Sequence, residues 1–209
     1  MKIIKVPFLL IWRSWFYIMI FITIVIMSPV LFILTLKEEY YPTLWKVVRF
    51  WSKILIYGMG FRLNFKLDQE IEPNKSYMFC PNHGSLMDGF VLVASSKNPI
   101  VFVGKKELEK IPIFGFFYKR VVIMVDRSNA ESRKKVYEKA KKRLKNGTSI
   151  GIFPEGTISV SFEIKELKSG AVRLAMGAGV PIVPTIVWGS QRIWTKKVKR
   201  NLRRQGVPI

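Results

Sequence analysis

Hydrophobic and polar positions divide this chain into an apolar N-terminal part and an alternating remainder. The 22 residues from Trp15 to Leu36 carry no charge, and a helix needs about 20 apolar residues to cross a bilayer. The run is longer than the apolar core of a signal peptide, and no small-residue cleavage site follows it. Basic residues flank it on both sides, so the positive-inside rule gives no orientation. We therefore expect a membrane segment, either a hairpin that bends at Ser28-Pro29 or a single tilted span.

A second apolar pattern covers residues 42–57. Its apolar residues recur at helical spacing, while Lys46, Arg49 and Lys53 form a stripe on another face. This pattern predicts an amphipathic helix that lies either in the membrane interface or against the protein's own domain. Gly58-Met59-Gly60 then ends the helix.

Beyond residue 60 the pattern alternates between strands and helices. Short apolar runs bounded by turn residues predict strands at 76–80, 100–103, 121–125, 149–153 and 182–187. The clearest helix covers 131–146, where Ser128 and Glu131 form a capping box. Such alternation predicts an α/β fold, with a mixed, largely parallel sheet flanked by helices. We expect N-terminal membrane-associated helices over residues 1–60 and a separate domain over residues 61–209.

One stretch of this domain is apolar without a regular period. Residues 111–117 are rich in Ile and Phe and contain Pro112 and Gly115, so we expect a loop there. Three placements of such a loop beside basic residues stay open: it could admit an apolar ligand chain, dip into lipid or be buried in the core.

Composition adds an electrostatic expectation. The formal net charge is +21 and 13% of the residues are aromatic, which describes a folded basic protein rather than a disordered basic tail. Such a protein suits an anionic partner: anionic membrane lipids, nucleic acid or an acidic carrier molecule. The bilayer-length apolar run and the lack of a recognisable nucleic-acid motif argue against nucleic acid. No acidic residue follows Glu166, and the basic residues there lie near Trp188 and Trp194, which suits an anionic membrane surface.

The candidate chemistry centres on His83, the only histidine in the chain. It follows the strand predicted at 76–80, so it should emerge at a strand end, where α/β proteins place their sites. Asp88 comes five residues later, and a turn leading into a helix can return its carboxylate to the imidazole ring. A surface histidine beside a helix-capping aspartate is the alternative. The lone Cys80 is more simply a small buried residue at a strand end than a nucleophile.

Four blocks in this chain resemble a known family. The sequence NHGSLMD at residues 82–88 matches the NHx4D block of the glycerolipid acyltransferases, the superfamily of 1-acylglycerol-3-phosphate acyltransferases. Three further stretches resemble the other blocks of this family in the same order: VVIMVDR at 121–127, FPEGT at 153–157 and VPIVP at 180–184. The resemblance covers residues 76–194, which is most of the chain beyond the apolar N-terminal part.

The resemblance implies a reaction and a set of residues. The reaction is transfer of a fatty acyl group from acyl-CoA or acyl-carrier protein to the free hydroxyl of 1-acyl-glycerol 3-phosphate, which gives phosphatidic acid in phospholipid biosynthesis. His83 would act as general base and Asp88 would orient its ring. The implied substrate-binding residues are Arg127, Lys105, Glu155, Gly156 and Thr157. The two cations would hold the acceptor's phosphate, the Glu155-Gly156 pair matches the family's acceptor-binding turn, and backbone amides of that turn or around Gly84 are candidate oxyanion donors. The motifs require no metal and no organic cofactor.

One position departs from the family's pattern. The third block usually continues with an arginine that contributes to acceptor binding, and Ile158 stands in that place. Either Arg127 with a lysine or Arg173 compensates, or the acceptor is a different lysolipid or polar lipid headgroup. A basic membrane-binding protein that retains the fold without turnover is a further alternative.

The resemblance also bears on location and on the end of the chain. We expect the protein at the cytoplasmic face of the inner or plasma membrane, in contact with anionic lipids. Members of the family usually continue further than residue 209, so a truncated C-terminus is compatible with the pattern.

Overall fold

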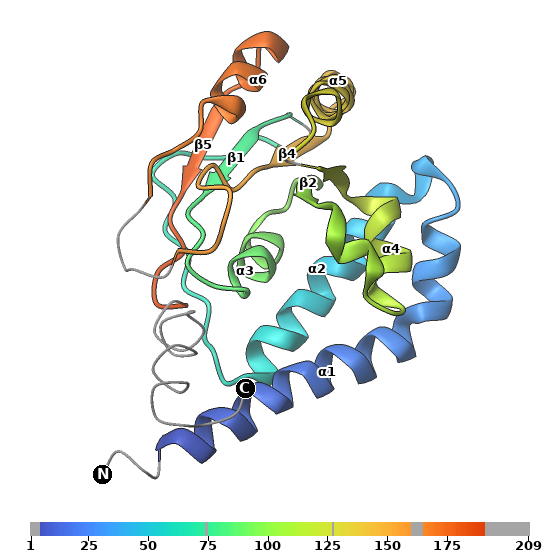
Figure 1. Ribbon diagram of the computed structural model, residues 1–209, viewed down its shortest axis with the longest axis vertical. Coiled ribbons are helices and arrows are strands. Elements are labelled where there is room, and N and C mark those ends of the chain that lie inside the picture. Colours follow the sequence, from blue (N-terminus) through green and yellow to red (C-terminus); the bar gives the residue numbers. More distant parts are fainter. Residues whose placement is uncertain (1–4, 74, 127, 160–164, 191–209) are drawn as a thin grey trace.

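The computed structural model describes residues 5–73, 75–126, 128–159 and 165–190 (Figure 1). The α-helices in these ranges are α1 (Lys5–Leu34), α2 (Tyr41–Gly58), α3 (Asp88–Ser95), α4 (Phe114–Val121), α5 (Ala130–Lys145) and α6 (Gly170–Ala178), with short 3-10 helices at η1 (Glu38–Tyr40) and η2 (Lys106–Lys110). The strands are β1 (Met78–Pro81), β2 (Ile100–Lys105), β3 (Ile123–Val125), β4 (Ser149–Gly151) and β5 (Ile182–Thr185).

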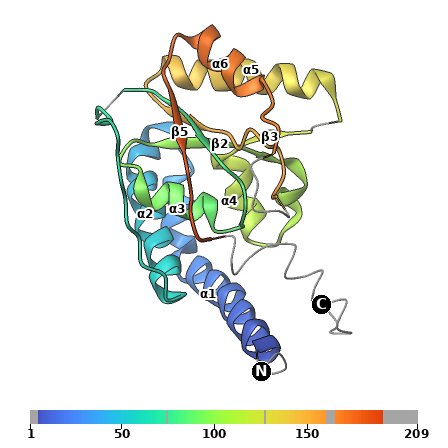
Figure 2. The same cartoon turned by 90° about the vertical axis from the view of Figure 1, so that its left-hand side faces the viewer.

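The strands form one sheet in the order β3-β2-β4-β1-β5, and every neighbouring pair is parallel. Helices α5 and α6 cover one face of the sheet, and α2, α3 and α4 lie on the other (Figure 2). Buried strands of a parallel sheet need apolar cover on both faces, which these two layers supply. The predicted α/β sheet flanked by helices is therefore confirmed. Because all strands point the same way, the loops after their carboxyl ends meet at one edge, where open α/β sheets place their ligands.

Helix α1 continues through Pro29, so the structure has a single helix and not the alternative of a hairpin that bends at Ser28-Pro29. A proline removes the N–H that would bond the carbonyl four residues earlier. Here the Ser28 hydroxyl donates to that carbonyl, of Val25, at 2.7 Å, so the acceptor keeps a partner and the helix is not broken. The chain turns instead after Leu34, and α2 then returns along α1 (Figure 1).

One side of α1 packs on the rest of the protein and the other is exposed. The buried side contributes Phe16, Met19, Ile24 and Leu31 to a core shared with α2 and α3. The outer side is apolar too: Ile11 and Ile26 are 70% and 71% exposed. Among the described helices, α1 alone is long and apolar enough to cross a membrane. An apolar helix with an exposed apolar side indicates association with a membrane.

The apolar stripe of α2 lies against the protein itself. Leu44, Trp51 and Leu55 are buried against α1 and α3, and the Trp51 indole donates to the Thr23 hydroxyl of α1 at 2.7 Å. The amphipathic pattern left open whether α2 lies in the membrane interface or against the protein's own domain, and in the structure its apolar stripe lies against the protein. Phe50, which lies off this stripe, is 64% exposed.

Two local expectations were wrong. The apolar stretch expected as a loop instead leads into helix α4, which begins at Phe114. Gly115 is required there because a side chain would collide with the Glu109 carbonyl, so it marks a close approach rather than a break. The cap of α5 is Asn129, whose side chain accepts from the amides of Glu131 at 2.8 Å and of Ser132 at 3.2 Å; Ser128 bonds Asp126 instead.

Candidate functional site

His83 lies immediately beyond the carboxyl end of β1. The preceding residue, Asn82, still pairs with β5 through its amide, which donates to the Thr185 carbonyl at 3.2 Å. The chain then turns through Gly84 and Ser85 and enters α3 at Asp88. This short turn places an imidazole and a carboxylate at the sheet edge where the strand ends converge.

Asp88 is fully buried and is held by hydrogen bonds on both oxygens. Its Oδ2 accepts from the amides of Gly84 and Ser85, each at 2.7 Å, and lies 3.3 Å from Nδ1 of His83. Its Oδ1 accepts from the Ser190 hydroxyl at 2.7 Å. These hydrogen bonds fix the orientation of the carboxylate beside the ring. In the tautomer that places the proton on Nδ1, facing Asp88, Nε2 of His83 carries the lone pair that can accept a proton.

The turn at residues 153–157 encloses the histidine from the other side. The Phe153 ring stacks on the imidazole with centroids 4.0 Å apart and planes 28° apart. The His83 carbonyl accepts from the Ser159 amide at 2.7 Å. The His83 side chain is nevertheless 20% exposed, so the ring is fixed in place and still reachable by a substrate.

Glu155 holds the backbone of the histidine loop. The carboxylate is buried, its Oε1 accepts from the His83 amide at 2.7 Å and its Oε2 from the Lys165 amide at 3.4 Å. Gly156 has φ +70, a conformation that favours glycine. The Lys168 ammonium lies beside it, because a Cβ built on Gly156 would stand 3.3 Å from Nζ. Thr157 is exposed next to this turn.

The remaining predicted residues are placed less directly. Lys105 ends β2, which β4 separates from β1, and its ammonium lies 3.2 Å from a Glu107 carboxylate oxygen at an exposed position. Arg127 lies outside the described residues. The structure thus brings together His83, Asp88, Glu155 and Gly156, and it puts Lys105 farther along the same edge.

Cys80 shows no sign of a nucleophile. Burial raises the pKa of its thiol to about 11, so at neutral pH the sulfur is protonated and only the thiolate attacks readily. The side chain packs against the core under α5 and α6. A covalent acyl-cysteine intermediate has no support in this arrangement.

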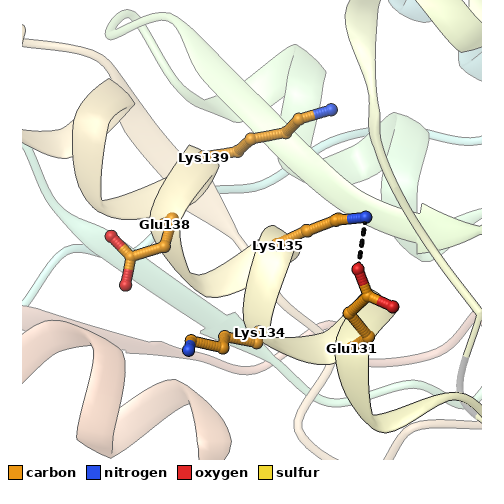
Figure 3. Close-up of a pocket in the computed structure, with 5 residues that line it drawn as sticks. All are labelled: Glu131, Lys134, Lys135, Glu138 and Lys139. Atoms are coloured by element: carbon orange, nitrogen blue, oxygen red, sulfur yellow. Dashed lines mark ion pairs between the residues drawn. The ribbon is translucent and has the colours of Figure 1, made fainter.

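A separate surface hollow lies on α5, which covers the face of the sheet away from α2, α3 and α4. It measures about 460 Å³ and is lined by Glu131, Lys134, Lys135, Glu138 and Lys139 of α5 (Figure 3). Lys135 pairs with Glu131 at 2.7 Å, and both side chains are largely exposed. None of these residues belongs to the His83 site. Nowhere in the described ranges do three His, Cys, Asp or Glu side chains gather as a metal ion would require.

Three contributors to the site were not predicted from sequence. Ser190 lies outside the four blocks and 102 residues from Asp88. Lys168 is one of several basic residues after Glu166, and nothing in its local pattern distinguishes it from the others. Phe153 lies inside the third block, but nothing in its local pattern indicates that it stacks on His83.

The sequence of this chain is similar to those of known proteins. The sequence model of the family described as Acyltransferase matches residues 62–188. A probable 1-acyl-sn-glycerol-3-phosphate acyltransferase of Mycoplasma pneumoniae is 31% identical over 162 residues, which is 75% of this chain and 60% of that protein. The 1-acyl-sn-glycerol-3-phosphate acyltransferase of Cocos nucifera is 32% identical over 65% of this chain and 44% of that protein. The chain therefore spans about three fifths of the first relative's length and less than half of the second's.

A solved structure shares the fold. The crystal structure of the 1-acyl-sn-glycerophosphate (LPA) acyltransferase, PlsC, from Thermotoga maritima superimposes with a TM-score of 0.73 at 22% identity, covering 91% of this chain and 78% of that one. The family model covers more than half of the chain, and the resemblance seen in the four blocks is confirmed. The chain belongs to the Acyltransferase family.

Proposed function

We propose that this protein transfers a fatty acyl group from acyl-CoA or acyl-carrier protein to the free hydroxyl of 1-acyl-glycerol 3-phosphate, giving phosphatidic acid. The observation that carries the proposal is the partly exposed His83 ring held against the buried Asp88 carboxylate. The names of the relatives support the same acceptor.

The histidine performs both proton transfers. Nε2 of His83 takes the proton of the acceptor hydroxyl while that oxygen attacks the thioester carbonyl, and the Asp88 carboxylate stabilises the resulting imidazolium. Collapse of the tetrahedral intermediate breaks the carbon–sulfur bond. The imidazolium then returns its proton to the leaving thiolate, so the enzyme ends in its starting state.

The oxyanion of that intermediate needs a hydrogen-bond donor. The amides of Gly84 and Ser85 already donate to Asp88, and that of Gly156 donates to the Phe153 carbonyl at 3.0 Å. Among the candidate amides we therefore assign this role to Thr157, which lies in the turn that encloses His83.

Lys168 is the cation we assign to the acceptor's phosphate. Ile158 leaves the third block without its usual arginine, while the Lys168 ammonium lies beside Gly156 in the same turn. The Lys168 amide also donates to the Pro154 carbonyl at 3.0 Å, which ties its backbone to this turn. A charge-assisted contact between ammonium and phosphate would anchor the acceptor next to His83.

Replacing Lys168 by alanine is expected to raise KM for 1-acyl-glycerol 3-phosphate about tenfold, the size of one exposed charge-assisted contact. The KM for the acyl donor should not change, and an uncharged lysolipid should be used no less well. Steady-state kinetics with each substrate varied in turn measures this. Lys145→Ala, at the far end of α5, is the matched control, and an equal effect of both variants would contradict the assignment.

The proposed reaction is tested by offering labelled acyl-CoA and acyl-carrier protein, in detergent micelles, to three acceptors: glycerol 3-phosphate, 1-acyl-glycerol 3-phosphate and an uncharged lysolipid. We expect label only in phosphatidic acid. Acylation of the uncharged lysolipid instead would transfer the function to another acceptor, as Ile158 would allow. Well-folded protein that acylates none of the three would support a non-catalytic membrane-binding role.

We further propose that the protein acts at the cytoplasmic face of the membrane with α1 lying along the lipid rather than across it. The support is the contact of α1 with α2 and α3 along the buried side from Phe16 to Leu31. A helix that crossed the bilayer would carry these partners into the hydrocarbon, where the polar groups of α2 would be costly. The exposed Lys46 of α2 and the net charge of +21 suit anionic lipids.

A further inference from the structure

We propose that Ser190 is a positioning residue for the His83–Asp88 pair, an inference that rests on the proposed function for its catalytic meaning. The Ser190 hydroxyl donates to Oδ1 of Asp88 at 2.7 Å, and both residues are buried. The other carboxylate oxygen, Oδ2, faces Nδ1 of His83. Ser190 thus holds the side of the carboxylate that the histidine loop does not reach.

The backbone after β5 is held so that the Ser190 hydroxyl lies next to Asp88. The Asn82 side chain, one residue before His83, binds Val187 at both backbone groups: Oδ1 accepts from the Val187 amide at 2.7 Å, and Nδ2 donates to its carbonyl at 3.3 Å. Gly189 then has φ +88, a left-handed conformation that turns the chain back. The result is that Ser190 points at Asp88 from a segment clamped to the histidine loop itself.

The physical role follows from how the carboxylate is shared. Oδ2 has three partners, the amides of Gly84 and Ser85 and the His83 ring, and Oδ1 receives the Ser190 hydroxyl. Without Ser190 the buried Oδ1 loses this donor, and the carboxylate can rotate to recover one, which takes Oδ2 away from Nδ1. Ser190 is buried and its hydroxyl is engaged with Asp88, so we expect its effect to reach the rate through the orientation of His83.

The kinetic test compares three Ser190 variants in the full chain. Ser190→Ala is expected to lower kcat at least tenfold with KM for both substrates unchanged. Ser190→Thr, which keeps the hydroxyl, should retain most of the rate, while Ser190→Cys, which has a similar size but a weak donor, should behave like alanine. Ser76→Ala is the matched control, because its hydroxyl is equally buried and also donates at 2.7 Å, to the Leu144 carbonyl away from the site.

A double-mutant cycle separates positioning from packing. In an Asp88→Asn background, Ser190→Ala should cost much less than it does in the wild-type chain, because the ion pair it would position is gone. Equal losses in both backgrounds, or a Ser190→Cys variant with the wild-type rate, would overturn the proposal. The cysteine variant also keeps the question open to measurement should the alanine variant fold poorly.

A readout without turnover makes the inference independent of the assigned reaction. Because His83 is the only histidine in the chain, its two ring nitrogens give an unambiguous pair of 15N resonances. We expect Ser190→Ala to shift these resonances and Ser76→Ala to leave them in place. Unshifted resonances would refute the positioning role even in a fully active enzyme, whereas shifted resonances in a protein that acylates no acceptor would refute only the proposed reaction.

Discussion

Replacing His83 by alanine is expected to lower the rate of acyl transfer by about 10²–10⁴-fold, which is the usual contribution of a positioned general base. Only water would then remain to take the proton from the hydroxyl of the lipid substrate. Asp88 cannot replace the histidine, because it is fully buried and its oxygens already accept other hydrogen bonds. Substrate binding should change little. In the proposed mechanism the imidazole contacts the lipid substrate only through the hydroxyl whose proton it takes. The loss should therefore appear in kcat rather than in KM.

The measurement is steady-state transfer from labelled acyl-CoA to 1-acyl-glycerol 3-phosphate, with folding checked by thermal denaturation. Cys80→Ser is the comparison: it changes the neighbouring strand but touches no part of the proposed mechanism, so the rate should stay close to that of the wild type. A His83→Ala enzyme with undiminished kcat would remove imidazole from the mechanism. Loss of activity in Cys80→Ser would revive a covalent intermediate.

Two substitutions of Asp88 are expected to separate its structural and catalytic effects. Asp88→Ala should lower the free energy of unfolding on the order of 3 kcal/mol or more, because it strands two buried amides and the Ser190 hydroxyl at about 1–3 kcal/mol each. Asp88→Asn should keep the fold, because its carbonyl oxygen can accept the two amides and its NH₂ can donate to the Ser190 oxygen. The neutral amide nevertheless leaves the imidazolium without its counter-charge. Its rate should therefore fall about 10²–10⁴-fold.

Chemical denaturation and steady-state kinetics on the same preparations decide between these effects. The expected pattern is an asparagine variant that is stable and slow and an alanine variant that is both unstable and slow. An asparagine variant that turns over at the wild-type rate would show that the negative charge is not used. An alanine variant as stable as the wild type would mean that the two amides find other acceptors.

The elements that follow local patterns could be predicted from the sequence. Strands β1 and β2 lie where short apolar runs indicated them, and α5 differs from its predicted range by one residue at each end. His83 and Asp88 could be paired because a tight turn and the first turn of a helix bring residues five apart together. Each of these inferences depends on neighbours within a few positions along the chain.

Features determined by distant contacts could not be predicted in this way. Ser190 reaches Asp88 only because parallel β1 and β5 are adjacent, which no pattern around either residue encodes. Gly115 lies in a stretch whose composition is typical of a loop. What requires a glycine there is the close approach of the Glu109 carbonyl, which belongs to η2. Pro29 resembles a helix breaker in the sequence. The Ser28 hydroxyl compensates for its missing N–H by donating to the Val25 carbonyl, and this depends on a side-chain rotamer that the sequence does not reveal. The predicted cap of α5, Ser128, instead bonds Asp126, and Asn129 caps the helix.

The packing of α1 on α3 bears on where the proposed reaction would take place. Phe16 of α1 packs edge-to-face against Phe90, with ring centroids 6.0 Å apart, and Phe90 lies two residues after Asp88 in α3. The apolar helix α1 thus packs directly on the helix that begins at Asp88. How deeply α1 settles into the lipid sets the height of His83 above the leaflet. In the proposed acyl transfer, only hydroxyls at one level of the headgroup layer would then reach His83, so the immersion depth of α1 would select among substrates.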